Sequence, residues 1–312
     1  MEYFYVIFPK LLSFFLLIGI GVLTVKCQII TSENLSLLSG LIVKLILPCL
    51  IFSLVWKNQT TFLSLWNFRR IILWQSITYF ILILLGFFII RICHLLSPTS
   101  NTLYGCIIGG NYGFIVIPLI MALFPDISGQ QYIPVCAATD TLFVWTIGIH
   151  LFTRTKKQSS AKLCSLKHVL NPVFLSFLTS IIICSIHLPL PAPVISVIDQ
   201  LGNTSCLGLI YLGSSLCFIH LKKLPSVKSL FLLILFRQIL FPVMIHLITR
   251  PFLPDTERIC IILVTAAPSF SAASMIAHQY HLDEDFASSA VFLTTLASAV
   301  TIPFVFYLMA VI

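Results

Sequence analysis

Charged residues are scarce in this chain. Asp, Glu, Lys and Arg make up 9% of its 312 residues, hydrophobic residues make up 59%, and the mean hydropathy is +1.06. In a soluble globular domain roughly a quarter of the residues are charged. A shortage on this scale excludes a water-soluble globule with a polar surface. It indicates a protein that crosses a membrane several times.

Motifs for catalysis are missing as well. No nucleotide-binding loop of the Walker type occurs, which argues against an ATP-driven pump acting alone. The 10 cysteines are scattered, mostly inside apolar stretches, without the spacing of metal ligands, so we expect small buried side chains, no metal site and no cofactor. Asp140 and His150 do not share a helix face one turn apart. The sequence therefore does not favour an enzyme.

Ten stretches of the sequence are apolar and long enough to cross a bilayer. A hydrocarbon core of roughly 30 Å needs about 20 apolar residues in one helix. The stretches lie near residues 4–24, 35–56, 71–92, 103–123, 132–152, 169–186, 194–219, 229–248, 259–278 and 286–311. We therefore predict an all-α membrane protein with ten transmembrane helices.

The cations are divided unequally between the two sides of these helices. Those after odd-numbered stretches are Lys26, Arg91, Arg154, Lys156, Lys157, Lys162, Lys167, Lys222, Lys223 and Lys228, whereas those on the other side are Lys57, Arg69, Arg70, Arg250 and Arg258. The positive-inside rule makes the first side cytoplasmic and places both termini outside. This distribution explains the net charge of +8 without a nucleic-acid partner. We expect a multi-pass protein of the cytoplasmic (inner) membrane.

The longest and most basic loop, at residues 154–168, follows the fifth stretch and divides the chain into residues 1–153 and 169–312. Each half then contains five stretches, so any repeat of one half in the other must be inverted in the membrane. FPKLLSF from Phe8 is similar to NPVFLSF from Asn171, and FVWT at Phe143 is similar to FLTT at Phe292. We therefore predict two inverted five-helix repeats joined by a short cytoplasmic loop.

The fourth and ninth stretches are interrupted. The fourth contains GGNYGFIVIPLI and the ninth contains TAAPSFSAASMIAHQY. Pro118 and Pro268 each remove a backbone donor, and each glycine lowers helix stability by roughly 1 kcal/mol. Irregular backbone at this depth must be buried in protein or line a wet cavity. Paired interrupted helices at matching places point to a transporter's binding site. The alternative is plain helix packing through the small residues Gly105, Gly109 and Gly113.

Three ionisable residues within the stretches are candidates for function, because a charge in the membrane is costly unless it is paired or hydrated. Lys44 lies in the middle of the second stretch and Arg237 in the middle of the eighth. Each could face an anionic substrate or pair with an acid. Asp140, early in the fifth stretch, could pair with one of them or accept a coupling proton.

Several motifs carry a resemblance to a known family. GNYGFIVIPL resembles the fourth-helix motif of the auxin efflux carrier family, whose bacterial members include malate- and malonate-permease-like proteins. Four other stretches agree with it in order and spacing: LIVKLILPCLIF from Leu41, the Asn-Pro pair at Asn171, LGLIYLGSSL from Leu207 and AAPSFSAASMIAHQYHLDEDFASSAVFLTT from Ala266. The central loop is far too short for the regulatory segment of the plant carriers.

The resemblance implies a ten-helix inverted-repeat fold similar to sodium/proton antiporters and bile-acid transporters, with alternating access. Helices four and nine would cross at their breaks, and a homodimer would form through scaffold helices. Carried onto this chain, the crossing comprises Asn111, Tyr112, Gly113, Phe114 and Pro118 from the first break and Ala267, Pro268 and Ser269 from the second, beside Ser271. Amino-terminal ends of half-helices suit a carboxylate, and the Asn111 side chain adds a donor and an acceptor.

The leading hypothesis is therefore secondary active or facilitated transport of a small organic anion, a carboxylate such as malate or an auxin-like acid. Whether a proton or a sodium ion is coupled to it stays open. The main alternative is a cation/proton antiporter on the same fold. Such exchangers usually need carboxylates near the broken helices, and the two interrupted motifs contain none. A receptor would need an appended domain.

Overall fold

The structure is a computed structural model that describes residues 2–153, 171–218 and 227–312. The predicted central loop at residues 154–168 lies outside the described residues. Helices occupy each of the ten stretches predicted from hydropathy. Within the described ranges, the one extended pairing is an isolated antiparallel bridge between Gly110 and Ser269. The structure thus agrees with the prediction of an all-α membrane protein.

The helices follow one another in the order of the predicted stretches. The first half contains α1 (Glu2–Lys26), α2 (Ser32–Leu41), η1 (Ile42–Ile46), α3 (Leu47–Lys57), η2 (Ser64–Phe68), α4 (Arg69–Cys93), α5 (Thr99–Ile108), η3 (Tyr112–Val116), α6 (Ile117–Leu123), α7 (Ile127–Gln130), α8 (Tyr132–Phe143), η4 (Val144–Gly148) and α9 (Ile149–Thr153). The second half contains α11 (Pro172–Ser185), α12 (Ala192–Asn203), η5 (Thr204–Cys206), α13 (Leu207–Cys217), α14 (Val227–Leu233), η6 (Ile234–Leu240), α15 (Phe241–Thr249), α16 (Asp255–Ala266), α17 (Ala273–Gln279) and α18 (Glu284–Val311).

Five helical runs within the described residues are long and apolar enough to cross a membrane. They are Ser32–Lys57, Ser64–Cys93, Tyr132–Thr153, Val227–Thr249 and Glu284–Val311, and shorter apolar helices lie at Leu12–Lys26, Tyr112–Leu123 and Pro172–Ser185. The count of ten spans and the inverted repeat stay predictions.

Three helical runs change from π-helix to α-helix one residue before a proline. η1, η3 and η6 are π-helical, and Pro48, Pro118 and Pro242 occupy the second position of the α-helix that follows. In each case the residue before the proline donates its N–H to the carbonyl five residues back: Leu47 to Ile42, Ile117 to Tyr112 and Phe241 to Phe236. Proline lacks an N–H and clashes with the carbonyl four residues earlier, and a local π-turn relieves this conflict.

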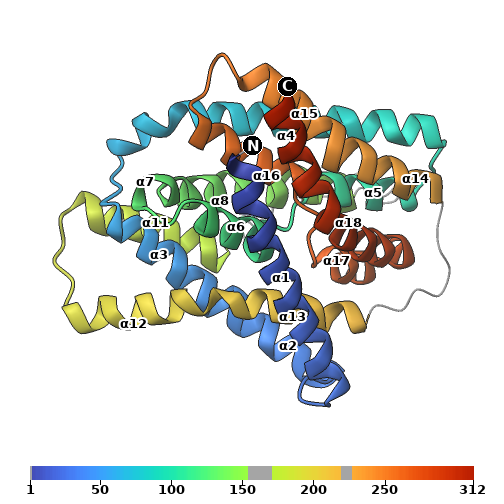
Figure 1. Ribbon diagram of the computed structural model, residues 1–312. Coiled ribbons are helices and arrows are strands. Elements are labelled where there is room, and N and C mark those ends of the chain that lie inside the picture. Colours follow the sequence, from blue (N-terminus) through green and yellow to red (C-terminus); the bar gives the residue numbers. More distant parts are fainter. Residues whose placement is uncertain (1, 154–170, 219–226) are drawn as a thin grey trace.

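The broken helices lie in the middle of the molecule. Figure 1 shows α3, α12 and α13 along one side, α4, α14 and α15 along the other, and α5, α6, α8 and α16 between them. α1 packs on α13, and α11 packs on α3. α4 contacts α5 and α8, while α18 contacts η6, α16 and α5.

Small residues allow α1 and α13 to approach closely. A Cβ at Gly213 would lie 1.9 Å from the Ile18 carbonyl oxygen, and one at Gly21 would lie 2.1 Å from that of Ile210. The Ser214 hydroxyl donates to the Gly21 carbonyl at 2.9 Å. Glycine and serine at such contacts are typical of packing between membrane helices.

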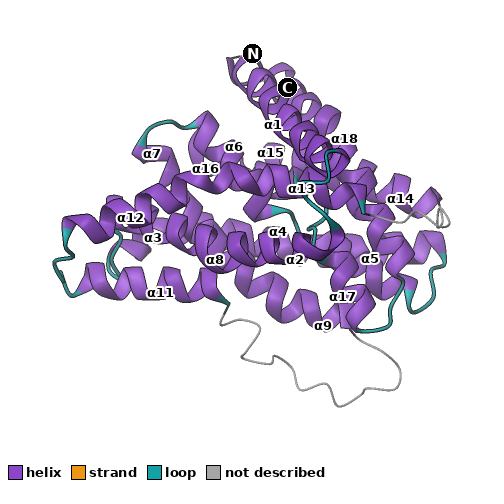
Figure 2. Cartoon of the chain, turned by 90° about the horizontal axis from the view of Figure 1, so that it is seen from below, coloured by secondary structure: helices purple, strands orange, loops and turns teal. Residues whose placement is uncertain are grey.

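The two ends of the chain are neighbours. Figure 2 shows the N and C labels close together, and α1 contacts α18. Which side of the membrane they occupy stays a prediction.

Candidate functional site

The two predicted breaks lie against each other. Residues 109–111 separate α5 from η3, and residues 267–272 separate α16 from α17. We call these two unwound stretches together the crossing. Gly110 and Ser269 pair across it as the antiparallel bridge.

Backbone hydrogen bonds join the two stretches of the crossing. The Asn111 N–H donates to the Pro268 carbonyl at 2.8 Å, and the Phe270 N–H donates to the Gly109 carbonyl at 3.1 Å. Breaks in helices leave backbone groups without a partner in the same helix, and such groups are costly at this depth. The crossing satisfies part of them by pairing one break with the other.

Ser269 fixes the second stretch to its surroundings. The Ser269 hydroxyl donates to the Cys106 carbonyl at 2.9 Å, and its N–H donates to the Thr294 hydroxyl of α18 at 3.0 Å. Its side chain is fully buried. Ser269 is therefore part of the framework of the crossing.

The glycine at position 109 is explained by close packing. A Cβ there would lie 2.3 Å from a ring carbon of Phe270, which is closer than real Cβ contacts allow. Only glycine lets the two stretches approach to the distance of the observed hydrogen bonds.

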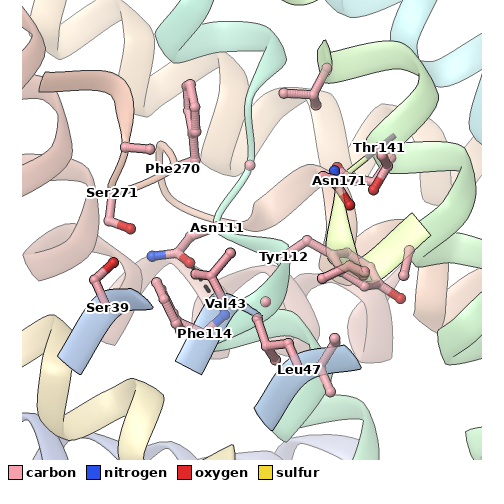
Figure 3. Close-up of a pocket in the computed structure, with 18 of the residues that line it drawn as sticks. Ser39, Val43, Leu47, Asn111, Tyr112, Phe114, Thr141, Asn171, Phe270 and Ser271 are labelled. Carbon is pink, nitrogen blue, oxygen red and sulfur yellow. Dashed lines mark hydrogen bonds between the residues drawn. The ribbon is translucent and has the colours of Figure 1, made fainter. Parts of the chain in front are cut away.

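Asn111 begins the second half of the first broken helix. Its side-chain oxygen accepts a hydrogen bond from the Phe114 N–H at 3.3 Å, so the residue caps η3. Its side-chain nitrogen is buried and has no hydrogen-bond partner among the described residues. Figure 3 shows this nitrogen directed toward Ser271 of the other break and Ser39 of α2. A buried amide donor without a partner is costly, so the site has an unused donor that a ligand can satisfy.

A cavity of about 480 Å³ opens in front of this donor. Apolar side chains make up most of its wall, including Val43, Leu47, Phe114 and Tyr211. Four regions line the pocket: residues 36–47 of α2, η1 and α3; the crossing with the starts of η3 and α17; residues 137–145 of α8 and η4; and Asn171, Val173 and Tyr211. A volume of this size is typical of small-molecule sites, which range from about 300 to 1,000 Å³.

Two of the ionisable candidates line this pocket. Asp140, on α8, accepts a hydrogen bond from the Tyr79 hydroxyl of α4. Lys44, in η1, is largely exposed. An acidic and a basic residue therefore line the same cavity as Asn111.

Arg237 lies elsewhere. It is 1% exposed and is absent from the pocket lining. Its Nε donates to the Ile107 carbonyl at 2.7 Å, and its Nη1 donates to the Ala267 carbonyl. Within the described ranges it forms no ion pair with a carboxylate. The structure thus shows the guanidinium bonded to the ends of α5 and α16.

The structure divides the residues proposed from the sequence into two groups. Those that line the pocket are Asn111, Tyr112, Gly113, Phe114, Ser271, Lys44 and Asp140. Those outside the lining are Pro118, Ala267, Pro268, Ser269 and Arg237.

Sequence reasoning missed part of the pocket wall. Ser39 and Gly40 of α2, Thr141 of α8 and Tyr211 of α13 line the cavity but were not candidates. The α2–α3 run offered a signal, because Ser36, Ser39, Gly40, Val43, Lys44 and Leu47 recur every three or four residues and so share a helix face. Nothing comparable marked Thr141 or Tyr211.

Comparison with known proteins identifies a family that this chain matches. The family model described as membrane transport protein matches residues 6–306. A search of curated proteins returns no match. Among the described residues, no three His, Cys, Asp or Glu side chains gather in a group that could hold a metal ion.

Proposed function

Because this chain belongs to the membrane transport protein family of auxin efflux carrier type, we propose that it moves a small organic anion across the cytoplasmic membrane by alternating access. The observation that carries the proposal is the buried Asn111 amide, whose nitrogen has no partner among the described residues and faces a cavity. A carboxylate of the substrate supplies the missing acceptor.

The surroundings of Asn111 favour a negative group. η3 and α6 form one helical stretch of residues 112–123, and its amino-terminal end lies at the pocket wall. The N–H groups and dipole of a helix amino terminus stabilise an anion. Ser39 and Ser271 add hydroxyl donors on either side, and Lys44 adds a positive charge to the same wall.

The rest of the wall favours a substrate with an apolar body. Val43, Leu47, Phe114 and Tyr211 can pack against hydrocarbon or an aromatic ring, which buries apolar surface. With one carboxylate held by the Asn111 amide and Lys44, the second carboxylate of a dicarboxylate would face this apolar wall or Asp140, which disfavours it. We therefore favour an auxin-like monocarboxylate over malate as the substrate class.

We also propose the inverted repeat of residues 1–153 and 169–312, supported by reciprocal contacts. α1 packs on α13 in the seventh stretch, and its counterpart α11 packs on α3 in the second stretch. α4 contacts α5 and α8, and its counterparts η6 and α15 contact α18 and α16. Reciprocal pairs of this kind are what an inverted repeat requires. We further propose a homodimer that forms through scaffold helices, meaning the helices that stay fixed while the rest of the protein moves during transport.

A cation/proton antiporter is the second candidate, and one observation favours it. The two interrupted motifs themselves contain no carboxylate. Asp140 nevertheless comes from the neighbouring helix and lines the same pocket as Asn111. Asp140 is therefore the residue most suited to bind a coupling proton, either for an antiporter or for anion transport driven by protons.

Uptake into proteoliposomes distinguishes these candidates. Labelled benzoate, indole-3-acetate and malate are offered while pH, sodium and membrane potential are varied separately. Anion transport predicts saturable uptake of at least one carboxylate, with the aromatic monocarboxylates preferred. Sodium- or potassium-dependent proton exchange without uptake of any carboxylate would support the antiporter and contradict the anion proposal.

A further inference from the structure

Arg237 is a buried cation with no assigned role in transport. Its side chain is 1% exposed, lies outside the pocket lining and forms no ion pair with a carboxylate within the described ranges. An unpaired charge in such a place is costly. The groups that it contacts directly therefore carry part of the compensation.

Those groups are the carboxyl ends of two helices. The guanidinium donates to the Ile107 carbonyl at 2.7 Å, in the last turn of α5, and to the Ala267 carbonyl, directly after α16. The last carbonyls of a helix have no partner within it, and together they carry a partial negative charge of about half a unit. Two such ends meet at the crossing. One arginine thus satisfies carbonyls of both, and the two ends stabilise its charge.

The guanidinium also fixes the spacing between the two broken helices. It is planar and rigid, so its two bonds hold Ile107 and Ala267 in one geometry. Gly110 leaves room for it, since a Cβ at that position would lie 3.0 Å from Nη2. The next residue is Asn111, whose own N–H is bonded to the second break.

We propose that Arg237 is a positioning residue: it ties the carboxyl ends of α5 and α16 together and thereby holds the Asn111 amide toward the pocket. It does not touch the substrate. The claim rests on the proposed function only in that Asn111 binds the anion.

The test combines substitutions at both residues. Arg237→Lys keeps the charge but loses the rigid two-point contact, so the folded variant should bind benzoate about tenfold more weakly, which corresponds to about 1.4 kcal/mol. In an Asn111→Leu background the same change should have no further effect on affinity, because Arg237 acts through Asn111. Equal losses in both backgrounds would overturn the proposal, as would wild-type affinity of folded Arg237→Lys.

A second variant covers the case in which Arg237→Lys does not fold. Gly110→Ala leaves the arginine in place and pushes on Nη2, so it should also weaken binding and should also lose its effect in the Asn111→Leu background. Gly148→Ala is the matched control, because its Cβ would meet an Ile108 methyl group at 3.2 Å and not the guanidinium. We call the two-point contact of Arg237 with the ends of α5 and α16 the clamp. If Gly110→Ala weakens binding no more than the control does, the clamp is contradicted.

Hydrogen exchange tests the clamp without any substrate. In either variant, backbone amides at residues 107–111 and at Ala267, Ser269 and Phe270 should exchange faster, while those of α1 and α13 stay as in the wild type. Unchanged exchange in both stretches would refute the clamp, even if no carboxylate binds to the wild-type protein. If the proposed function were wrong but the positioning role right, both variants would still exchange faster in these stretches, while the wild-type protein would bind no carboxylate.

Discussion

The two broken helices use their polar groups differently. In the second break the buried Ser269 is bonded through both its hydroxyl and its N–H. In the first break the Asn111 N–H is bonded to Pro268, but the side-chain nitrogen has no partner among the described residues. Asn111 and Ser269 thus differ in role: Ser269 supports the crossing, whereas Asn111 presents an unused donor to the pocket.

The largest effect is expected where the two breaks touch. Gly109→Ala places a Cβ 2.3 Å from the Phe270 ring, so the ring or the backbone must move. Overpacking of this kind costs about 1–3 kcal/mol. We expect a clearly lower Tm and loss of uptake. Gly19→Ala is the control, since its Cβ would meet nothing within 4 Å. Equal Tm values for the two variants would show that the breaks do not depend on this contact.

Substitution of the two prolines should affect the two broken helices to different extents. Pro118→Ala restores an N–H within a helix, where proline costs about 3 kcal/mol, so the π-turn of η3 can relax and carry Asn111 out of place. Uptake should fall strongly without loss of Tm. If Pro268 acted only as a helix breaker, Pro268→Ala should behave in the same way. Pro268 lies in the unwound stretch, however, and its carbonyl still accepts from Asn111 after substitution.

A smaller loss is therefore expected for Pro268→Ala than for Pro118→Ala. Initial uptake rates in proteoliposomes, normalised to the amount of reconstituted protein, measure the difference. Equal losses would mean that both prolines matter only as helix breakers.

Ser269→Ala should affect stability and not affinity. It removes one buried hydrogen bond, worth about 0.5–1.5 kcal/mol, and leaves the pocket wall intact. A Tm lowered by a few degrees with benzoate affinity within twofold of wild type is expected. Weaker binding at unchanged Tm would place Ser269 in the binding site and remove the contrast between the breaks.

The smallest effect on rate is expected at Asp140. Asp140→Asn keeps the size of the side chain and an acceptor for Tyr79, but it cannot release a proton. Uptake should continue at a similar maximal rate, and its dependence on pH should flatten. Asp126→Asn, at an exposed position before α7, is the control. A pH profile that matches the wild type would exclude Asp140 as the coupling group.

The sequence predicted the crossing better than it predicted the pocket. Pro268 and the glycines disclose broken helices because their effect on the backbone is local. Pro118 lies inside the helical stretch of residues 112–123, where it marks the π-turn and not the break. The position of Asp140 in the pocket depends on how α8 turns toward the crossing, which no local pattern encodes. Arg237 is instructive in a different way. The sequence shows only that a cation in the middle of a membrane helix needs compensation, and it indicates an acid or an anionic substrate as the partner. The structure supplies helix carbonyls instead.

The most direct measurement is equilibrium binding of benzoate to Asn111→Asp. This change keeps the shape of the side chain and the oxygen that caps η3, but it replaces the unused donor with a negative charge. A folded variant should therefore lose more than about a hundredfold in affinity, since removing a hydrogen bond to a charged group and leaving like charges together costs roughly 3 kcal/mol or more. Asn67→Asp, at an exposed position in η2, should bind as the wild type does. Wild-type affinity in Asn111→Asp would contradict the claim that this amide holds the anion.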